Sequence, residues 1–230
     1  MTAYLTDSIF FGAMLSLAAY EAGLLIKKRL KLAILNPLLI ATVCVMAVLI
    51  LLKIEYKQYN EGAKYISYLL TPATVCLAVP LYQQLELLKK NLKAVAGGIT
   101  AGVLASLISV LLLSKLFSLT HEQYVTLLPK SITTAIGMGV SEELGGIQTI
   151  TVAVIIVTGI LGNVIAEFVC RIFRIEEPIA KGLALGTASH AIGTAKAMEL
   201  GEVEGAMSSL AIAVAGLMTV VGASVFANLM

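Results

Sequence analysis

The stretch SITTAIGMGVSEELGG, Ser131 to Gly146, interrupts a strongly apolar chain with glycine, hydroxyl and carboxylate side chains. Backbone that leaves the helical path inside a bilayer has unpaired N–H and C=O groups, and each costs several kcal/mol in hydrocarbon. Such a segment persists at membrane depth only where protein or a water-filled cavity satisfies those groups. The stretch therefore predicts a cavity within a membrane protein.

The composition agrees with an integral membrane protein. Of the 230 residues, 59% are hydrophobic and 13% are charged, whereas soluble domains carry about a quarter charged residues. The formal net charge of +2 is too small to indicate a nucleic-acid partner. Cys44, Cys76 and Cys170 are isolated within apolar stretches, which predicts neither a disulfide framework nor a metal site. No cofactor is expected.

Apolar runs of about 20 residues are long enough to cross a bilayer. The sequence predicts a single membrane domain, 1–230, with plain transmembrane helices at about 5–26, 32–52, 94–117, 147–170 and 206–229. Three further segments are apolar but carry Pro, Gly, Ser or Thr near their middle, and they lie at about 62–88, 122–146 and 178–201.

The interrupted segments resemble one another. TVCLAVPLYQQL (74–85), TTAIGMGVSEEL (133–144) and SHAIGTAKAMEL (189–200) align without gaps, and the last two share Ala, Ile, Gly, Glu and Leu in register. Small residues are common in membrane helices, so chance similarity is the alternative explanation. If the similarity is a true repeat, a unit of one interrupted segment followed by one plain span occurs three times in the chain.

Lysine and arginine favour a re-entrant path for 122–146. Cytoplasmic loops are enriched in these residues. If 122–146 crosses the bilayer, the inner and outer loops carry nearly equal numbers of Lys and Arg residues. If the segment enters and returns on the same side, the inner loops carry a clear excess of them. By its resemblance, 178–201 is expected to be a second hairpin entering from the opposite side. The expected fold is an all-α integral membrane protein with plain transmembrane helices plus interrupted, re-entrant segments in an inverted-repeat, transporter-like arrangement.

The two hairpins supply most of the candidate site. Half-helix N-termini offer partial positive charge and unpaired N–H donors to an anion, and intramembrane ionisable residues are usually functional. Close approach of backbone to a ligand is expected at Gly137, Gly139 and Gly193. The residues expected to bind substrate are Thr74, Lys130, Ser131, Thr133, Thr134, Gly137, Ser189, His190, Gly193, Thr194 and Lys196. Those expected to gate the site or couple an ion are Glu142, Glu143 and Glu199.

Each of these residues also has a simpler explanation. Lys130 could snorkel to an interface, the glutamates could lie in exposed turns, and the hydroxyls could bond i−4 carbonyls. His190 and Lys196 are harder to explain in this way, because a cation at depth needs a counter-charge and a carboxylate substrate would supply it. No enzyme is expected, since the chain lacks GxSxG and HExxH motifs and has only two histidines.

Three longer stretches carry a family resemblance. LLTPATVCLAVPLYQQ (69–84), LLPKSITTAIGMGVSEELGG (127–146) and ALGTASHAIGTAKAMELGEVEGAMSSL (184–210) resemble, in this order, the signature stretches of the LrgB/CidB family. Bacterial members are described as antiholin-like or holin-associated proteins that affect murein hydrolase export and cell lysis. Other members are described as carriers of pyruvate in bacteria and of glycolate and glycerate in the plastid envelope.

The resemblance and the hairpins together imply a carrier of pyruvate-, lactate- or glycolate-like monocarboxylates that works by alternating access. The alternative is an antiholin-like or holin-associated membrane protein that regulates murein hydrolase export and cell lysis. The expected location is the inner (cytoplasmic) membrane, with several crossings. The expected partners are a small carboxylate, an LrgA/CidA-like small membrane protein and the lipid bilayer, without nucleic acid, and a homo-oligomer stays open.

Overall fold

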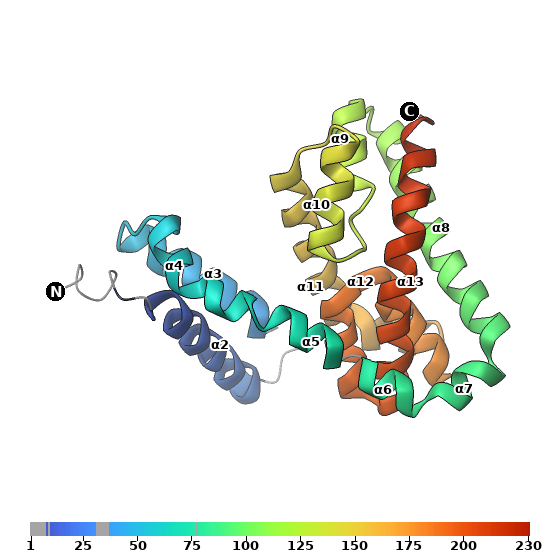
Figure 1. Cartoon of the computed structure of the whole chain (residues 1–230), viewed down its shortest axis with the longest axis horizontal. Helices are drawn as coiled ribbons and strands as arrows, with labels where there is room; N and C mark the ends of the chain where they lie inside the picture. Colours follow the sequence, from blue (N-terminus) through green and yellow to red (C-terminus); the bar gives the residue numbers. More distant parts are fainter. Residues whose placement is uncertain (1–7, 9, 31–36, 77) are drawn as a thin grey trace. The chain divides into compact units, whose positions relative to one another are not determined.

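The computed structural model describes residues 8, 10–30, 37–76 and 78–230, and the regular structure in these ranges is helical (Figure 1). The chain divides into two compact units, Met1–Cys76 and Leu77–Met230. The candidate site lies in the second unit.

The first unit is built around one helix. Its helices are α2 (Phe11–Leu30), α3 (Pro37–Leu51), α4 (Tyr56–Ser67) and α5 (Leu70–Cys76). Helix α2 packs against α3 and α4, and its glycines allow close contact, since Gly12 lies against the backbone of Tyr59 and Gly23 against that of Pro37. The hydroxyls of Ser16 and Tyr59 share a hydrogen bond of 2.7 Å. Small residues thus set the helix spacing, as in membrane bundles.

The expected spans 5–26 and 32–52 begin among residues 1–7 and 31–36, which lie outside the described ranges. Within those ranges, α3 is strongly apolar but only 15 residues long.

Three helices of the second unit are long and apolar enough to cross a membrane: α8 (Leu92–Leu116), α11 (Gln148–Ile172) and α13 (Glu202–Ala227). They correspond to the expected spans 94–117, 147–170 and 206–229. One stripe of α8, which includes Val95, Ile99 and Val103, is buried, while apolar side chains on its other faces are exposed. A helix that is apolar all round suits a lipid environment. The chain is therefore a membrane protein whose described regular structure is all helical.

The interrupted segment 62–88 forms the end of α4 and three short helices, α5, α6 (Ala78–Gln83) and α7 (Leu85–Lys90). Pro72 and Pro80 lie in the first turns of α5 and α6. First-turn N–H groups have no intrahelical acceptor, so a proline costs least there. The prolines are thus tolerated near the helix starts, and the described breaks of this segment lie at 68–69 and at Gln84.

The segment 122–146 forms a helical hairpin of α9 (His121–Leu127) and α10 (Thr134–Glu143). Helix α9 begins with a capping box, in which the Gln123 N–H donates to Thr120 Oγ1 and the Thr120 N–H donates to the Gln123 side chain. After α10, the Ile147 N–H donates to Thr126 Oγ1 at 2.8 Å, and the Thr151 hydroxyl donates to Thr126 O at 2.9 Å. The end of the segment therefore lies beside α9.

The segment 178–201 forms α12 (Pro178–Leu200), which is broken at His190, where φ is 42° and ψ is −136°. The chain reverses there, because a Cβ added to Gly193 would lie 2.5 Å from the carbonyl oxygen of Leu185. In an unbroken helix, residues eight apart are separated by about 12 Å. Helix α12 is thus a second hairpin with two antiparallel arms.

Helix α13 packs against both hairpins. Thr194 and Ser208 share a hydrogen bond of 2.7 Å on the α12 side, and the Tyr124 hydroxyl donates to Phe226 O at 2.9 Å on the α9 side. The glycines of α12 allow close packing, since a Cβ added to Gly186 would lie 2.5 Å from Ser208 O. In Figure 1 the C-terminus lies at the same end of this unit as α9.

Candidate functional site

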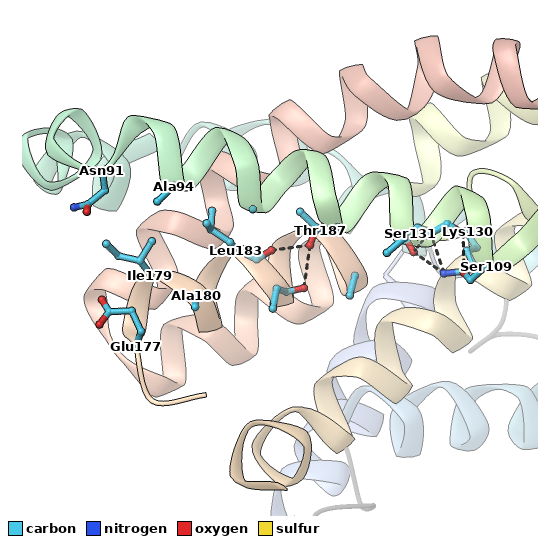
Figure 2. Close-up of a pocket in the computed structure, with 16 residues that line it drawn as sticks. Asn91, Ala94, Ser109, Lys130, Ser131, Glu177, Ile179, Ala180, Leu183 and Thr187 are labelled. Carbon is cyan, nitrogen blue, oxygen red and sulfur yellow. Dashed lines mark hydrogen bonds between the residues drawn. The ribbon is translucent and has the colours of Figure 1, made fainter. Parts of the chain in front are cut away.

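A cavity of about 670 Å³ lies between α8, α12 and the turn that joins α9 to α10. Asn91 and Glu177 line one end, and Lys130 and Ser131 line the other (Figure 2). The wall between them consists mostly of alanine and glycine from α8 and α12, with Ile179 and Leu183. The cavity is therefore an apolar slot with a polar inner end.

Lys130 dominates that inner end. Its ammonium donates to Ser131 Oγ at 2.9 Å and to Ser106 Oγ at 3.2 Å, and Ser109, which also lines the cavity, donates to Ser106 O. Among the described residues, Lys130 therefore has hydroxyl partners and no carboxylate. The lining thus offers a cation and several hydroxyls at one place.

The depth of Lys130 argues against snorkelling. Helix α8 has 25 residues, so it is roughly 37 Å long, and Ser106 lies near its middle. A snorkelling lysine extends its ammonium to the end of a span. The ammonium of Lys130 lies beside the middle of α8 instead.

The turn of the second hairpin reaches the same part of α8. Thr187 lines the cavity, and a Cβ added to Gly102 would lie 2.7 Å from Thr187 Oγ1. The Thr187 hydroxyl donates to Leu183 O at 2.8 Å. Since Gly102 and Ser106 are one helical turn apart, both hairpin turns border the inner end of the cavity.

Two helices begin at these turns. Helix α10 starts at Thr134, and the side chain of its N-cap Thr133 makes no capping hydrogen bond. The second arm of α12 begins just after His190. The first N–H groups of a helix have no intrahelical acceptor and carry partial positive charge. Both helix starts follow lining residues in the sequence, Ser131 and Ala188, but Thr133, Thr134 and His190 do not themselves line the cavity.

His190 is a structural residue of the break in α12. The side chain is buried, and its Nε2 lies 3.0 Å from Ile155 O on α11. Because a carbonyl only accepts, Nε2 must carry the proton. Gly159 admits the ring, since a Cβ there would lie 2.8 Å from it, and Asn163 Nδ2 donates to Ile192 O at 3.0 Å. Helix α11 therefore fixes the turn through its glycine and asparagine.

The other expected ligands on α12 lie at the turn or along the second arm, outside the cavity lining. Ser189 and Gly193 are buried where the two arms meet, and the Thr194 hydroxyl bonds within the protein. Lys196 lies 2.5 Å from Glu167 on α11 and 3.2 Å from Glu199. The protein itself thus balances the charge of Lys196 with two carboxylates, whereas Lys130 has hydroxyl partners.

The remaining expected residues are placed as follows. The side chain of Thr74 lies outside the described part of the chain, and α5 belongs to the first unit. Glu142 and Glu143 are exposed at the end of α10 away from the turn. Gly137 packs against Ile155 of α11, but nothing lies within 4 Å of a Cβ added to Gly139. No protein atom therefore approaches Gly139 closely, and the expected approach of a ligand to its backbone stays a prediction.

Sequence reasoning missed the contribution of the plain spans. Ser106 and Ser109 lie in a helix that was expected only to cross the membrane, and Glu167 in another. One signal was present, because Gly98, Gly102 and Ser106 repeat every four residues, a spacing typical of close helix packing. In the described ranges no three His, Cys, Asp or Glu side chains gather closely enough to hold a metal ion.

Replacing Lys196 by methionine should lower the melting temperature in detergent by a few degrees. The ion pair with Glu167 ties the second arm of α12 to α11, but the Glu167 side chain is half exposed, so roughly 1 kcal/mol is expected. The paired exchange Lys196→Glu with Glu167→Lys should recover most of the loss. If the exchange is no more stable than Lys196→Glu alone, the pair does not join the two helices.

Comparison with known proteins gives consistent matches along the chain. A family model described as the LrgB-like family matches residues 16–229. The antiholin-like protein LrgB of Bacillus cereus strain B4264 is 40% identical over 217 residues, which cover 94% of this chain and 94% of that protein. The proteins of the same name from B. cereus strain AH187 and Bacillus anthracis strain CDC 684 show the same identity and coverage. No solved structure matches the chain.

Proposed function

This chain belongs to the LrgB-like family, and within that family we propose that it binds a small monocarboxylate beside Lys130 and carries it across a membrane. The observation that carries the proposal is the Lys130 ammonium, which lines a cavity and has only hydroxyl partners among the described residues. Lys130 is half-buried, and a partly buried cation without a counter-charge carries a desolvation cost that a bound carboxylate lowers.

The lining favours a single carboxylate with a small polar substituent. Ser109, Ser131 and Thr187 offer hydroxyls for the hydroxy or keto group of a lactate- or pyruvate-like acid. A second carboxylate would lie along the apolar wall or beside Glu177, where no cation of the lining balances it. We therefore propose monocarboxylates rather than dicarboxylates as substrates.

Alternating access would come from the two hairpins, treated as an inverted pair. The α9–α10 hairpin opens toward the end of the unit where Thr126 contacts Ile147, and the α12 hairpin opens toward the end where Glu177 and Asn91 line the cavity. Opposed hairpins whose turns meet near the midplane are typical of carriers. Movement of the hairpins relative to α8 would expose the site to one side at a time.

In this arrangement the site would face the cytoplasm. The cavity extends toward Asn91, which lies beside Lys89, Lys90 and Lys93, and the positive-inside rule assigns such a cluster to the cytoplasmic side. Toward the other end of the unit, the Tyr124 hydroxyl donates a hydrogen bond to Phe226 O, which joins α9 to α13. The proposed location is the inner membrane of a bacterial cell.

Labelling should test the hairpin topology in a variant whose native cysteines, Cys44, Cys76 and Cys170, are replaced by serine. Cysteines placed singly at Glu122 and Gly146 should react with an impermeant maleimide from the same side of sealed vesicles. Cysteines at Glu177 and Gly201 should both react from the opposite side. Labelling of Glu122→Cys and Gly146→Cys from different sides would reject a re-entrant path for the first hairpin.

Substrate protection should test binding at the cavity. In the same background, pyruvate or lactate should slow alkylation of Ser109→Cys, because Ser109 lines the polar end. Gly97→Cys is the matched control, since it lies on the same helix with open space around its Cβ. Equal rates of alkylation of Ser109→Cys with and without these acids would contradict carboxylate binding at this end of the cavity.

The second candidate is an antiholin-like protein that regulates murein hydrolase export and cell lysis. The names of the relatives favour this reading over the carrier. It would act with an LrgA/CidA-like small membrane protein as partner. The two candidates differ at Lys130, because a carrier requires its charge and a purely regulatory protein does not. The regulatory function would be supported by two results together: the unmodified chain shows no monocarboxylate uptake, and the Lys130→Met variant still delays lysis.

A further inference from the structure

A second pocket, of about 330 Å³, lies where α11 connects to α12. Three cationic side chains line it, those of Arg171, Arg174 and Lys181. It shares no lining residue with the cavity at Lys130. Substrate binding in the proposed carrier therefore does not use this group of cations.

The cations of this pocket lack acidic partners. In the part of the chain that the structure describes, Arg171, Arg174 and Lys181 form no ion pair. Two carboxylates also line the pocket, but that of Glu167 forms an ion pair with Lys196 at 2.5 Å. The lining therefore holds three cations and one further carboxylate, that of Glu176. Like charges that share a pocket repel each other, and an anion with several oxygens relieves that repulsion.

The surroundings of the pocket suit a lipid. Helix α11 is long and apolar enough to span a membrane, and it ends at Ile172, within the run of residues that lines the pocket. Beside the arginines, Phe168 is 65% exposed and Phe173 is 71% exposed. Lipid phosphates lie at the ends of spans, and exposed apolar side chains there face the acyl chains.

We propose that this pocket binds the phosphate group of an anionic membrane lipid. The two guanidinium groups suit phosphate oxygens through paired N–H donors, and Lys181 adds a third positive charge. The acyl chains of the same lipid lie along Phe168 and Ile172, and Leu200 contributes apolar lining to the pocket. Because the ligand must combine a phosphate with an apolar tail, a lipid headgroup fits better than free phosphate.

The test compares two variants with the same loss of charge in the purified full-length chain. The pocket variant combines Arg171→Gln, Arg174→Gln and Lys181→Gln, and the control combines Lys89→Gln, Lys90→Gln and Lys93→Gln, which line a different surface pocket. Retention of phosphatidylglycerol against phosphatidylcholine is measured by native mass spectrometry in detergent. The pocket variant should retain phosphatidylglycerol at least roughly 10-fold less, and the control should match the unmodified chain.

Three results would overturn the proposal. Equal loss in both variants would mean diffuse attraction to a basic face, and equal retention of both lipids by the unmodified chain would remove the preference for an anionic headgroup. Displacement of bound phosphatidylglycerol by inorganic phosphate at equal concentration would assign the pocket to the free anion. If the triple variant is not monodisperse, Arg174→Gln alone is compared with Lys90→Gln, with the same expected order.

Discussion

Replacing Lys130 by methionine is expected to lower monocarboxylate uptake on the order of 100-fold. The variant keeps a side chain of similar length but loses the ammonium that would balance the substrate carboxylate. A charge-assisted hydrogen bond contributes about 1.5–3 kcal/mol, which corresponds to roughly 10- to 150-fold in affinity. The measurement is the initial rate of labelled pyruvate or lactate uptake into vesicles that contain equal amounts of folded protein.

Lys115→Met is the matched control for this variant. Lys115 lies in the last turn of α8 and is exposed, so its loss should leave uptake within about twofold. Ser106→Ala removes one hydroxyl partner of Lys130 and should give an intermediate loss. Uptake by Lys130→Met at the rate of the unmodified chain would show that the substrate does not depend on this cation.

Gly193→Val is expected to prevent closure of the second hairpin. A Cβ at this position would lie 2.5 Å from the Leu185 carbonyl oxygen and 2.6 Å from Ser189 Cβ, so the two arms of α12 must separate. Overpacking of a close contact typically costs about 1–3 kcal/mol, and more where backbone must move. Loss of monodisperse protein on size exclusion, or a melting temperature lower by roughly 10 °C or more, is the expected result.

Gly97→Val and Gly139→Val are the controls for the glycine prediction. Nothing lies within 4 Å of a Cβ added at either position, although both residues belong to helices of the same unit, α8 and α10. Both variants should therefore remain folded. If valine at Gly193 is tolerated as well as at Gly97 and Gly139, the antiparallel contact between the arms of α12 is wrong.

Much of this fold is readable from the sequence. The lengths of the apolar runs predict α8, α11 and α13, because a helix that crosses a bilayer must be long and apolar. The glycines and hydroxyls of 122–146 and 178–201 predict segments that leave the helical path, and the structure breaks them at 128–133 and at His190. Pro72 likewise lies in the first turn of α5, just after the break at 68–69.

The partners of individual side chains were less predictable. His190 and Lys196 were expected to meet substrate, but α11 supplies Ile155 O to the first and Glu167 to the second. Their sequence neighbours could not reveal these partners, since Ile155 lies 35 residues from His190 in the sequence although α11 is the preceding helix. Lys130, by contrast, donates a hydrogen bond to Ser106 on α8, a helix whose sequence predicts only a plain transmembrane span. Pairing across helices depends on packing, and the local pattern does not encode it.

The central claim, that the cavity at Lys130 serves a carrier, is tested most directly by uptake into vesicles containing only the purified chain and a lipid bilayer. The account predicts saturable uptake of labelled pyruvate or lactate above that of empty vesicles. Unlabelled lactate should compete, and Lys130→Met should lower the signal on the order of 100-fold. A parallel set of vesicles also contains the LrgA/CidA-like partner. Uptake equal to that of empty vesicles in both sets, from protein that is folded and membrane-inserted, would contradict the carrier.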